Sequence, residues 1–89
     1  MIQFTNEQRE QIINFGAFGY SENRISSILE LDIDEVTKDF SDKNSELSKL
    51  LQKGKVMADY VIDLKLFELA KSGDIKALSK LQTRKSLRK

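Results

Sequence analysis

The sequence predicts an all-α protein in which three short helices precede a long antiparallel helical hairpin. Proline is absent from the 89 residues, and strand-like alternation of apolar and polar residues is weak. Apolar residues recur instead at helical spacing, after polar residues that are typical helix caps. We therefore expect three parts: residues 1–43 as a tri-helical domain, residues 44–83 as the hairpin, and residues 84–89 as a basic tail.

The three short helices are predicted from their caps. Thr5 and the glutamine three residues later have the spacing of a capping box. Gly19, in "FGAFGY", is a natural left-handed cap for the end of this helix. Ser21 caps the second helix, and either Asp32 or Asp34 caps the third. The apolar residues that we expect to face the core or to fill the turn are Ile12, Ile13, Phe15, Ile25, Ile28, Leu29, Ile33, Val36 and Phe40.

The hairpin begins with the longest predicted element. Ser45 caps a helix that runs from about residue 46 to Lys71, and Gly73 terminates it. Asp74 caps a last helix that frays in "TRKSLRK". Because the link "SGD" is so short, the two helices must be antiparallel. The residues of the last helix that we expect to point inward are Ile75, Leu78 and Leu81.

The long helix carries apolar residues on two faces. One set steps by three and four residues, the spacing of a coiled-coil seam, and small residues such as Gly54 allow another helix to approach closely. Two apolar stripes imply burial on two sides, so the second face packs on the tri-helical domain or on another subunit. The residues that we expect at an interface between subunits are Leu47, Leu50, Leu51, Gly54, Met57, Ala58, Val61, Ile62, Leu66 and Leu69.

The composition excludes several kinds of chemistry. Cysteine and histidine are absent, which removes disulfides, thiolate nucleophiles, histidine-based catalysis and the usual zinc ligands. With neither a phosphate loop nor a nuclease-type acidic cluster, we expect no catalytic residue, no metal and no cofactor. No apolar run approaches the roughly 20 residues that span a bilayer, and "MIQFTNEQRE" is not a signal peptide. We therefore expect a cytoplasmic protein with no membrane partner.

Charge is distributed unevenly along the chain. Residues 1–42 hold three basic residues against nine acidic ones, a net charge of −6. Residues 71–89 hold seven basic residues against one acidic one, a net charge of +6. Such asymmetry indicates partners, and "RKSLRK" is dense enough in charge to bind phosphates or an acidic surface. Opposite poles also favour head-to-tail contacts between subunits, the geometry that closes into rings.

The stretch "GYSENRISSILELDIDEVTKDF" resembles a helix-turn-helix in its order of cap, apolar frame and turn. Where many members of that family have glycine in the turn, this chain has Glu30. Residues 32–43 carry a net charge of −3, whereas DNA affinity comes mainly from lysine and arginine on phosphates. Docking of a protein partner therefore competes with DNA reading as the use of this third helix.

The stretch "LLQKGKVMADYVIDLKLFELAKSGDIKALSKLQTRK" resembles the small subunit of tailed-bacteriophage terminases over roughly residues 50–84. With the helix-turn-helix, the resemblance spans nearly the whole chain. It implies a non-catalytic subunit of viral genome packaging that assembles into a homo-oligomeric ring through its hairpin. It also implies binding to double-stranded viral DNA, and regulation of the large terminase subunit, the ATPase and nuclease, in the host cytoplasm.

If the chain binds DNA, we expect cations of the tail and of the tri-helical domain to contact the phosphates. These are Arg24, Lys38, Lys43, Lys80, Arg84, Lys85, Arg88 and Lys89. Two other functions stay open: a small dimeric helix-turn-helix transcriptional regulator, and a protein-interaction adaptor that does not bind DNA. The oligomeric state separates the packaging subunit, which forms a ring, from the regulator, which forms a dimer. Binding to random duplex at low salt separates the adaptor from both.

Overall fold

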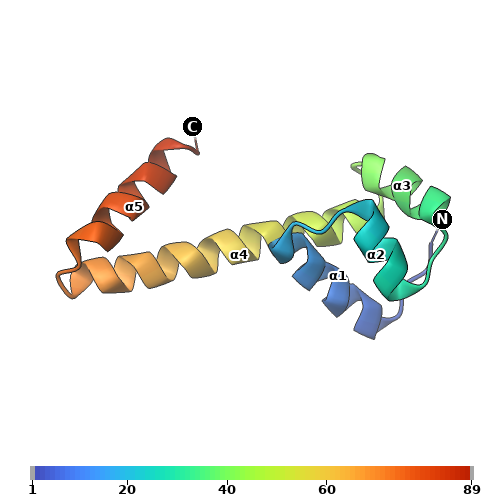
Figure 1. Ribbon diagram of the computed structural model, residues 1–89, viewed down its shortest axis with the longest axis horizontal. Coiled ribbons are helices and arrows are strands. Elements are labelled where there is room, and N and C mark those ends of the chain that lie inside the picture. Colours follow the sequence, from blue (N-terminus) through green and yellow to red (C-terminus); the bar gives the residue numbers. More distant parts are fainter. Residues whose placement is uncertain (1, 89) are drawn as a thin grey trace. The chain divides into compact units, whose positions relative to one another are not determined.

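The computed structural model describes residues 2–88, which form five α-helices (Figure 1). They are α1 (Asn6–Phe18), α2 (Glu22–Leu29), α3 (Ile33–Ser41), α4 (Glu46–Lys71) and α5 (Ile75–Ser86). The predicted all-α class is therefore confirmed. Internal contacts divide the chain inside α4, into a first unit (Met1–Met57) and a second unit (Ala58–Lys89). Within residues 2–88, none of the helices has the length and apolar character that a membrane crossing requires.

Each helix begins directly after a residue that the sequence predicts as its cap, and α1 ends at Gly19 as predicted. The Thr5 hydroxyl accepts a hydrogen bond from the Gln8 N–H at 3.1 Å, and the Gln8 side chain accepts one from the Thr5 N–H at 2.9 Å. Gly19 ends α1 with a left-handed φ of 73°. These contacts satisfy backbone groups that helix ends leave open. The other caps, in which Asp32 takes the role left open between it and Asp34, are Ser21, Asp32, Ser45 and Asp74.

The first unit has one apolar core, to which α1, α2, α3 and the start of α4 all contribute. Ile2 and Phe4 also belong to it, and the sequence analysis missed them because they precede the first helix. Full burial of such a side chain is worth roughly 1.5–3 kcal/mol, so this cluster stabilises the unit. Its buried members are Ile2, Phe4, Ile12, Phe15, Ile25, Leu29, Val36 and Leu47.

Two isoleucines, one predicted to face the core and one predicted to fill the turn, are exposed instead. Ile28 is 44% exposed and Ile33 is 39% exposed. In α2 the buried residues are Ile25, Ser26 and Leu29, so the buried face lies on the other side of Ile25 from Ile28. Ile33 is the first residue of α3, and it stands one turn before Val36, the buried residue of that helix. The predictions for Ile28 and Ile33 are therefore wrong.

Glycine allows α1 and α4 to cross in close contact. A Cβ atom at Gly54 would lie 1.7 Å from the carbonyl oxygen of Ile13, and one at Gly16 would lie 2.0 Å from that of Leu51. No side chain fits at either distance, so the two backbones approach at positions where only glycine is tolerated. The sequence predicted a close approach at Gly54, and the structure identifies the partner as α1 of the same chain.

In the second unit the chain reverses between α4 and α5. Gly73 adopts a left-handed φ of 103°, and the Asp74 side chain then accepts a hydrogen bond from the Ala77 N–H. In the described part of this unit, Ala77 is the buried apolar residue. Ile75 and Leu78 were predicted to point inward, but they are 80% and 44% exposed. The buried side of α5 instead carries Ala77 and, four residues later, half-buried Leu81.

Candidate self-association and nucleic-acid surfaces

The second half of α4 carries an exposed apolar face. Tyr60, Leu64 and Phe67 step by four and three residues along α4, so they share one side of the helix, which Val61 extends. They are 59%, 40% and 48% exposed, and Val61 is 59% exposed. We call these four residues the α4 apolar face. Apolar residues gathered in this way on a small protein typically mark a contact surface.

A different side of α4 contacts α5. Asp59 and Asp63 accept hydrogen bonds from Arg84, and Ile62 and Leu66 line a shallow hollow with residues of α5. These four α4 residues again step by three and four, so they belong to one side of the helix. Within the second unit, α5 therefore occupies that side and leaves the α4 apolar face open to a partner.

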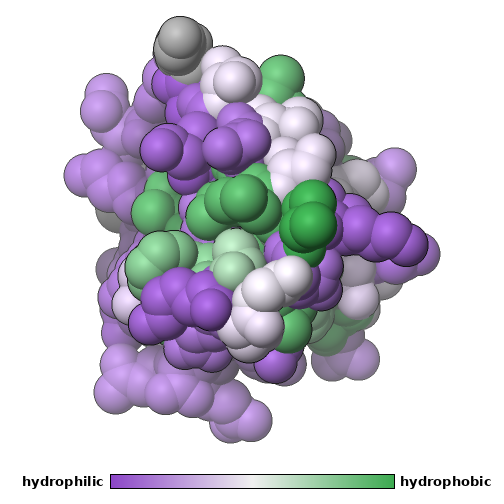
Figure 2. Space-filling view, turned by 90° about the vertical axis from the view of Figure 1, so that its left-hand side faces the viewer, coloured by the Kyte–Doolittle hydropathy of each residue, from purple (hydrophilic) through white to green (hydrophobic). Residues whose placement is uncertain are grey.

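Further apolar side chains are exposed around the turn between the two helices. Figure 2 views the protein from the end at which α4 passes into α5, and hydrophobic side chains gather there in the middle of a hydrophilic surface. Ile75, at the start of α5, is 80% exposed, and Leu78 is 44% exposed. The apolar surface of the second unit thus includes residues of α5 as well as the α4 apolar face.

The predicted subunit-interface residues fall into three groups. Those covered by the first unit itself are Leu47, Leu50, Leu51 and Gly54. Those half-buried in the second unit are Ala58, Leu66 and Leu69. Those exposed on α4 are Met57, Val61 and Ile62. Tyr60 and Phe67 were not predicted at the interface, although their spacing of three and four residues from Leu64 indicates a common face.

The predicted nucleic-acid-binding residues are divided between the two units. In the first unit, the Arg24 guanidinium lies 4.9 Å from the centre of the Tyr20 ring, and Lys38 is exposed on α3. Lys43 lines a groove that is described below. The predicted cations that belong to α5 or follow it in the second unit are Lys80, Arg84, Lys85 and Arg88. Lys89 lies outside the described residues.

Arg84 and Arg88 are paired with carboxylates. Arg84 Nε donates to Asp63 Oδ1 at 2.6 Å and Arg84 Nη2 donates to Asp59 Oδ1 at 3.2 Å, while Arg88 Nη2 donates to Asp63 Oδ2. The hydrogen bond from Arg84 holds the pKa of Asp63 below its ordinary value of 3.8, against the opposing effect of desolvation. Because α5 extends to Ser86, the prediction of a tail frayed from Thr83 onward is wrong.

The exposed surface of α3 is dominated by carboxylates. Asp34 and Glu35 are exposed in its first turn, and Lys38 is its basic residue. Asp32 precedes the helix and its side chain accepts the N–H of Asp34, as a helix cap does. A duplex phosphate backbone would be repelled by this distribution of charge. The local charge therefore favours a basic partner for α3.

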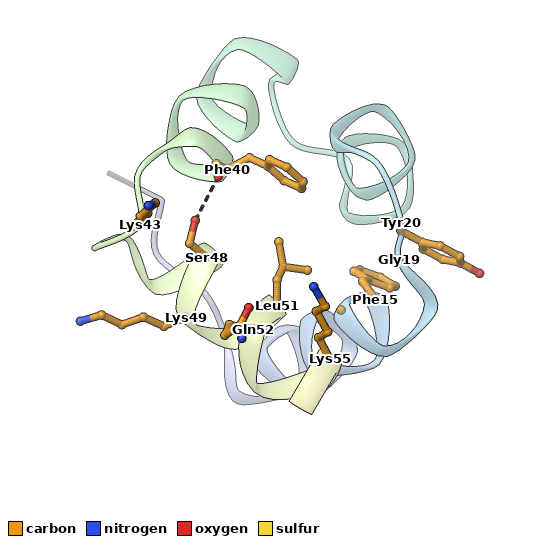
Figure 3. A pocket seen from close by; sticks show the side chains of 11 residues that line it. Phe15, Gly19, Tyr20, Phe40, Lys43, Ser48, Lys49, Leu51, Gln52 and Lys55 are labelled. Atoms are coloured by element: carbon orange, nitrogen blue, oxygen red, sulfur yellow. Dashed lines mark hydrogen bonds between the residues drawn. The ribbon is translucent and has the colours of Figure 1, made fainter. Parts of the chain in front are cut away.

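The first unit also contains an apolar groove of about 640 Å³ with a basic rim, seen from close by in Figure 3. Phe40 and Leu51 point into its opening, and Lys55 lies on one side of it. Lys43 and Lys49 lie on the other side, so three lysines surround the apolar floor. None of the described residues that line it is acidic. We call this feature the lysine-rimmed groove. Its lysines recur every six residues, a spacing that does not place residues on one face of a helix, so the groove was not predicted from the sequence.

No protein-family model matches the chain, and no curated protein or solved structure matches it. Among residues 2–88, no group of three or more potential ligand side chains is arranged to hold a metal ion. The fold and the surfaces therefore define an all-α protein with an exposed α4 apolar face and, in a first unit built from α1, α2, α3 and the start of α4, a lysine-rimmed groove.

Proposed function

We propose that the chain is a non-catalytic phage DNA-packaging subunit, similar to the terminase small subunit, that self-associates, binds duplex DNA and regulates a large ATPase-nuclease. The observation that carries this proposal is the α4 apolar face. It is exposed on the second half of α4, where another side of the helix contacts α5, whereas the first half of α4 contributes to the core of the first unit. The resemblance of the sequence to the terminase small subunit supports the proposal, because that family assembles into rings through this region.

The strength of the proposed association follows from the size of the α4 apolar face. Its four side chains are each about half exposed, so covering each gains on the order of 1 kcal/mol. Two such faces together gain on the order of 8 kcal/mol, which falls within the estimated 4–15 kcal/mol cost of bringing two molecules together. One pair of faces therefore gives a weak dimer, and a stable ring needs a further contact between subunits.

For DNA binding we propose the exposed lysines of α5. Lys76 and Lys80 are four residues apart and share one side of the helix, and Lys85 lies five residues after Lys80. The ion pairs described for residues 2–88 involve none of these three lysines. Each of them can therefore neutralise a phosphate without first breaking an ion pair.

One observation favours the adaptor as a second candidate function. The carboxylates of α3 would repel DNA from the helix that a helix-turn-helix normally uses, and Arg84 and Arg88 are already paired. In that function the chain would bring proteins together and would not touch DNA. A dimeric transcriptional regulator would instead pair two copies through α4 and then bind duplex.

Two measurements on the full chain separate these functions. Native mass spectrometry at low salt gives a ring of more than two copies for the packaging subunit and a dimer for the regulator. Fluorescence anisotropy with a labelled random-sequence duplex shows binding that weakens as salt rises for both of them. A chain that leaves the duplex free at low salt, whatever its oligomeric state, would exclude both and leave the adaptor.

A further inference from the structure

The lysine-rimmed groove combines an apolar floor with positive charge. Phe15, Phe40 and Leu51 contribute to the floor, and Lys43 and Lys49 to the rim together with Lys55. Ion pairs described for residues 2–88 involve none of these lysines. A ligand that satisfies this groove must bring both apolar groups and carboxylates, because either alone would leave the floor or the rim without a partner.

The first unit also carries a surface with the matching chemistry. Ile28 and Ile33, the two isoleucines that fail to enter the core, are 44% and 39% exposed. Between and beside them stand exposed Glu30, Asp32 and Asp34. We call residues 28–34 the α2–α3 corner. It presents two exposed isoleucines with three carboxylates, which is the combination that the lysine-rimmed groove requires.

The groove and the corner of one chain cannot meet each other. Ile33 is the first residue of α3, whereas Phe40, which lines the groove, is near its last residue. Seven residues of helix separate these positions by about 10 Å along the axis of a rigid helix. Two complementary surfaces that are fixed apart on one molecule can be satisfied only between molecules, in a head-to-tail contact.

We propose that the lysine-rimmed groove of one copy receives the α2–α3 corner of a second copy. The contact places Ile28 and Ile33 over the floor at Phe40 and Leu51, with Glu30 and Asp34 against the rim lysines. It supplies the further contact that a ring needs beyond the α4 apolar face, but it depends neither on that face nor on DNA binding. Because it uses charges at the surface, it weakens as salt rises.

Duplex DNA is a less suitable occupant. Its phosphates would satisfy the lysines, but a phosphate backbone brings no apolar group to cover Phe40 and Leu51. The acidic α3, which belongs to the same unit, would also repel it. An acidic segment of a foreign protein could carry the right chemistry, whereas the α2–α3 corner is already present on every copy. The experiment distinguishes all three occupants.

The test joins neighbouring carboxylates and lysines by zero-length cross-linking with a carbodiimide, on full chain at high concentration and low salt without DNA. An equal mixture of unlabelled and ¹⁵N-labelled protein identifies links between copies by their mixed isotope content. We expect mixed links from Lys43, Lys49 or Lys55 to Glu30, Asp32 or Asp34. Absence of such links, or links from these lysines only to other carboxylates, overturns the proposal.

Charge reversal provides the second measurement. One variant carries Lys43→Glu, Lys49→Glu and Lys55→Glu, and a second carries Glu30→Lys and Asp34→Lys, with the cap Asp32 kept. In sedimentation velocity each variant alone should associate less than the wild type, because groove and corner then bear like charge. Mixing the two should restore association, since the reversed groove of one fits the reversed corner of the other.

The control for net charge carries Lys53→Glu and Lys65→Glu, two exposed lysines of α4 that lie outside the groove. It should associate more than the groove variant does, and circular dichroism should show every variant folded. A mixture of the two reversed variants that fails to recover association overturns the proposal. So does a groove variant that loses only duplex binding, because the groove would then belong to DNA.

Discussion

Arg84 Nε donates a hydrogen bond to Asp63 Oδ1 at 2.6 Å, which joins the last turns of α5 to the middle of α4 across 21 residues of sequence. Arg88 donates to the same carboxylate, and Arg84 reaches Asp59 as well. Two arginines and two aspartates thus connect the helices of the second unit. The same contacts engage Arg84 and Arg88, two of the cations that were predicted from the sequence to bind DNA.

The first prediction concerns pH. The arginines lower the pKa of Asp63 below 3.8 in the folded chain. The ion pairs of Asp63 with Arg84 and Arg88 therefore stabilise the second unit at pH values above the pKa of an ordinary aspartate. This stabilisation is lost as pH falls below 3.8 and through the lowered pKa. Asp63→Asn should make hydrogen exchange of α5 amides faster at neutral pH and remove its acid dependence. Glu68→Gln, at an exposed acid of the same helix, is the control; equal exchange in both variants would contradict the prediction.

The second prediction concerns the crossing of α1 and α4. A methyl group at Gly54 would meet the backbone at Ile13, which has no flexible side chain to move aside. Gly54→Ala should therefore lower the free energy of unfolding by about 3 kcal/mol, although alanine is the better helix former. Lys55→Ala, at the neighbouring exposed position, should change it by no more than about 0.5 kcal/mol. Urea denaturation measures both, and a neutral or stabilising Gly54→Ala would refute the close approach.

The third prediction concerns the C-cap of α2. Glu30 has a φ of 56°, the left-handed region in which a side chain costs about 1–2 kcal/mol. Glu30→Gly should raise the free energy of unfolding by about 1 kcal/mol, because glycine adopts this conformation without strain but is freer when unfolded. Glu30→Ala removes the carboxylate and keeps the strain, so it should give no such gain. Equal thermal stability of the two variants would mean that strain at this residue is negligible.

The fourth prediction concerns the α5 lysines. If Lys80 and Lys85 each neutralise one phosphate, Lys80→Gln with Lys85→Gln should reduce the slope of log affinity against log salt by about 1.8. Lys53→Gln with Lys65→Gln, two exposed lysines of α4, should leave the slope unchanged. Anisotropy titrations with a random duplex over a range of salt concentrations provide both slopes. A loss of slope in the α4 variant, and not in the α5 variant, would assign the phosphate contacts to α4.

Much of the secondary structure could be predicted because helix ends depend on nearby residues. Thr5, Ser21 and Asp74 cap helices through hydrogen bonds that span three residues, and Gly19 and Gly73 supply left-handed φ angles. Such local chemistry is visible in a single sequence. Burial is less local: Ile28 and Ile33 have helical spacing to core residues, yet they lie just outside the contact between helices.

The candidate surfaces were harder to predict because they depend on how distant segments pack. Gly54 was recognised as a small residue, but only the structure pairs it with α1. The lysines of the groove come from a loop and from α4, and nothing in their spacing indicates a shared site. The pairing of Asp63 with Arg84 did leave a signal. They lie ten residues before and eleven residues after Gly73, so a chain reversal there brings them together.

Self-association through the α4 apolar face is the central claim, and light scattering of the full chain at high concentration and low salt tests it most directly. The wild type should have a mass of more than two copies. The variant with Val61→Glu and Leu64→Glu, both at exposed positions, should stay folded and fall to a smaller species. Lys65→Glu, at the exposed position directly after Leu64, is the control and should retain the wild-type mass. A wild type that remains strictly monomeric, or a Val61→Glu and Leu64→Glu variant that associates as well as the wild type, would contradict the claim.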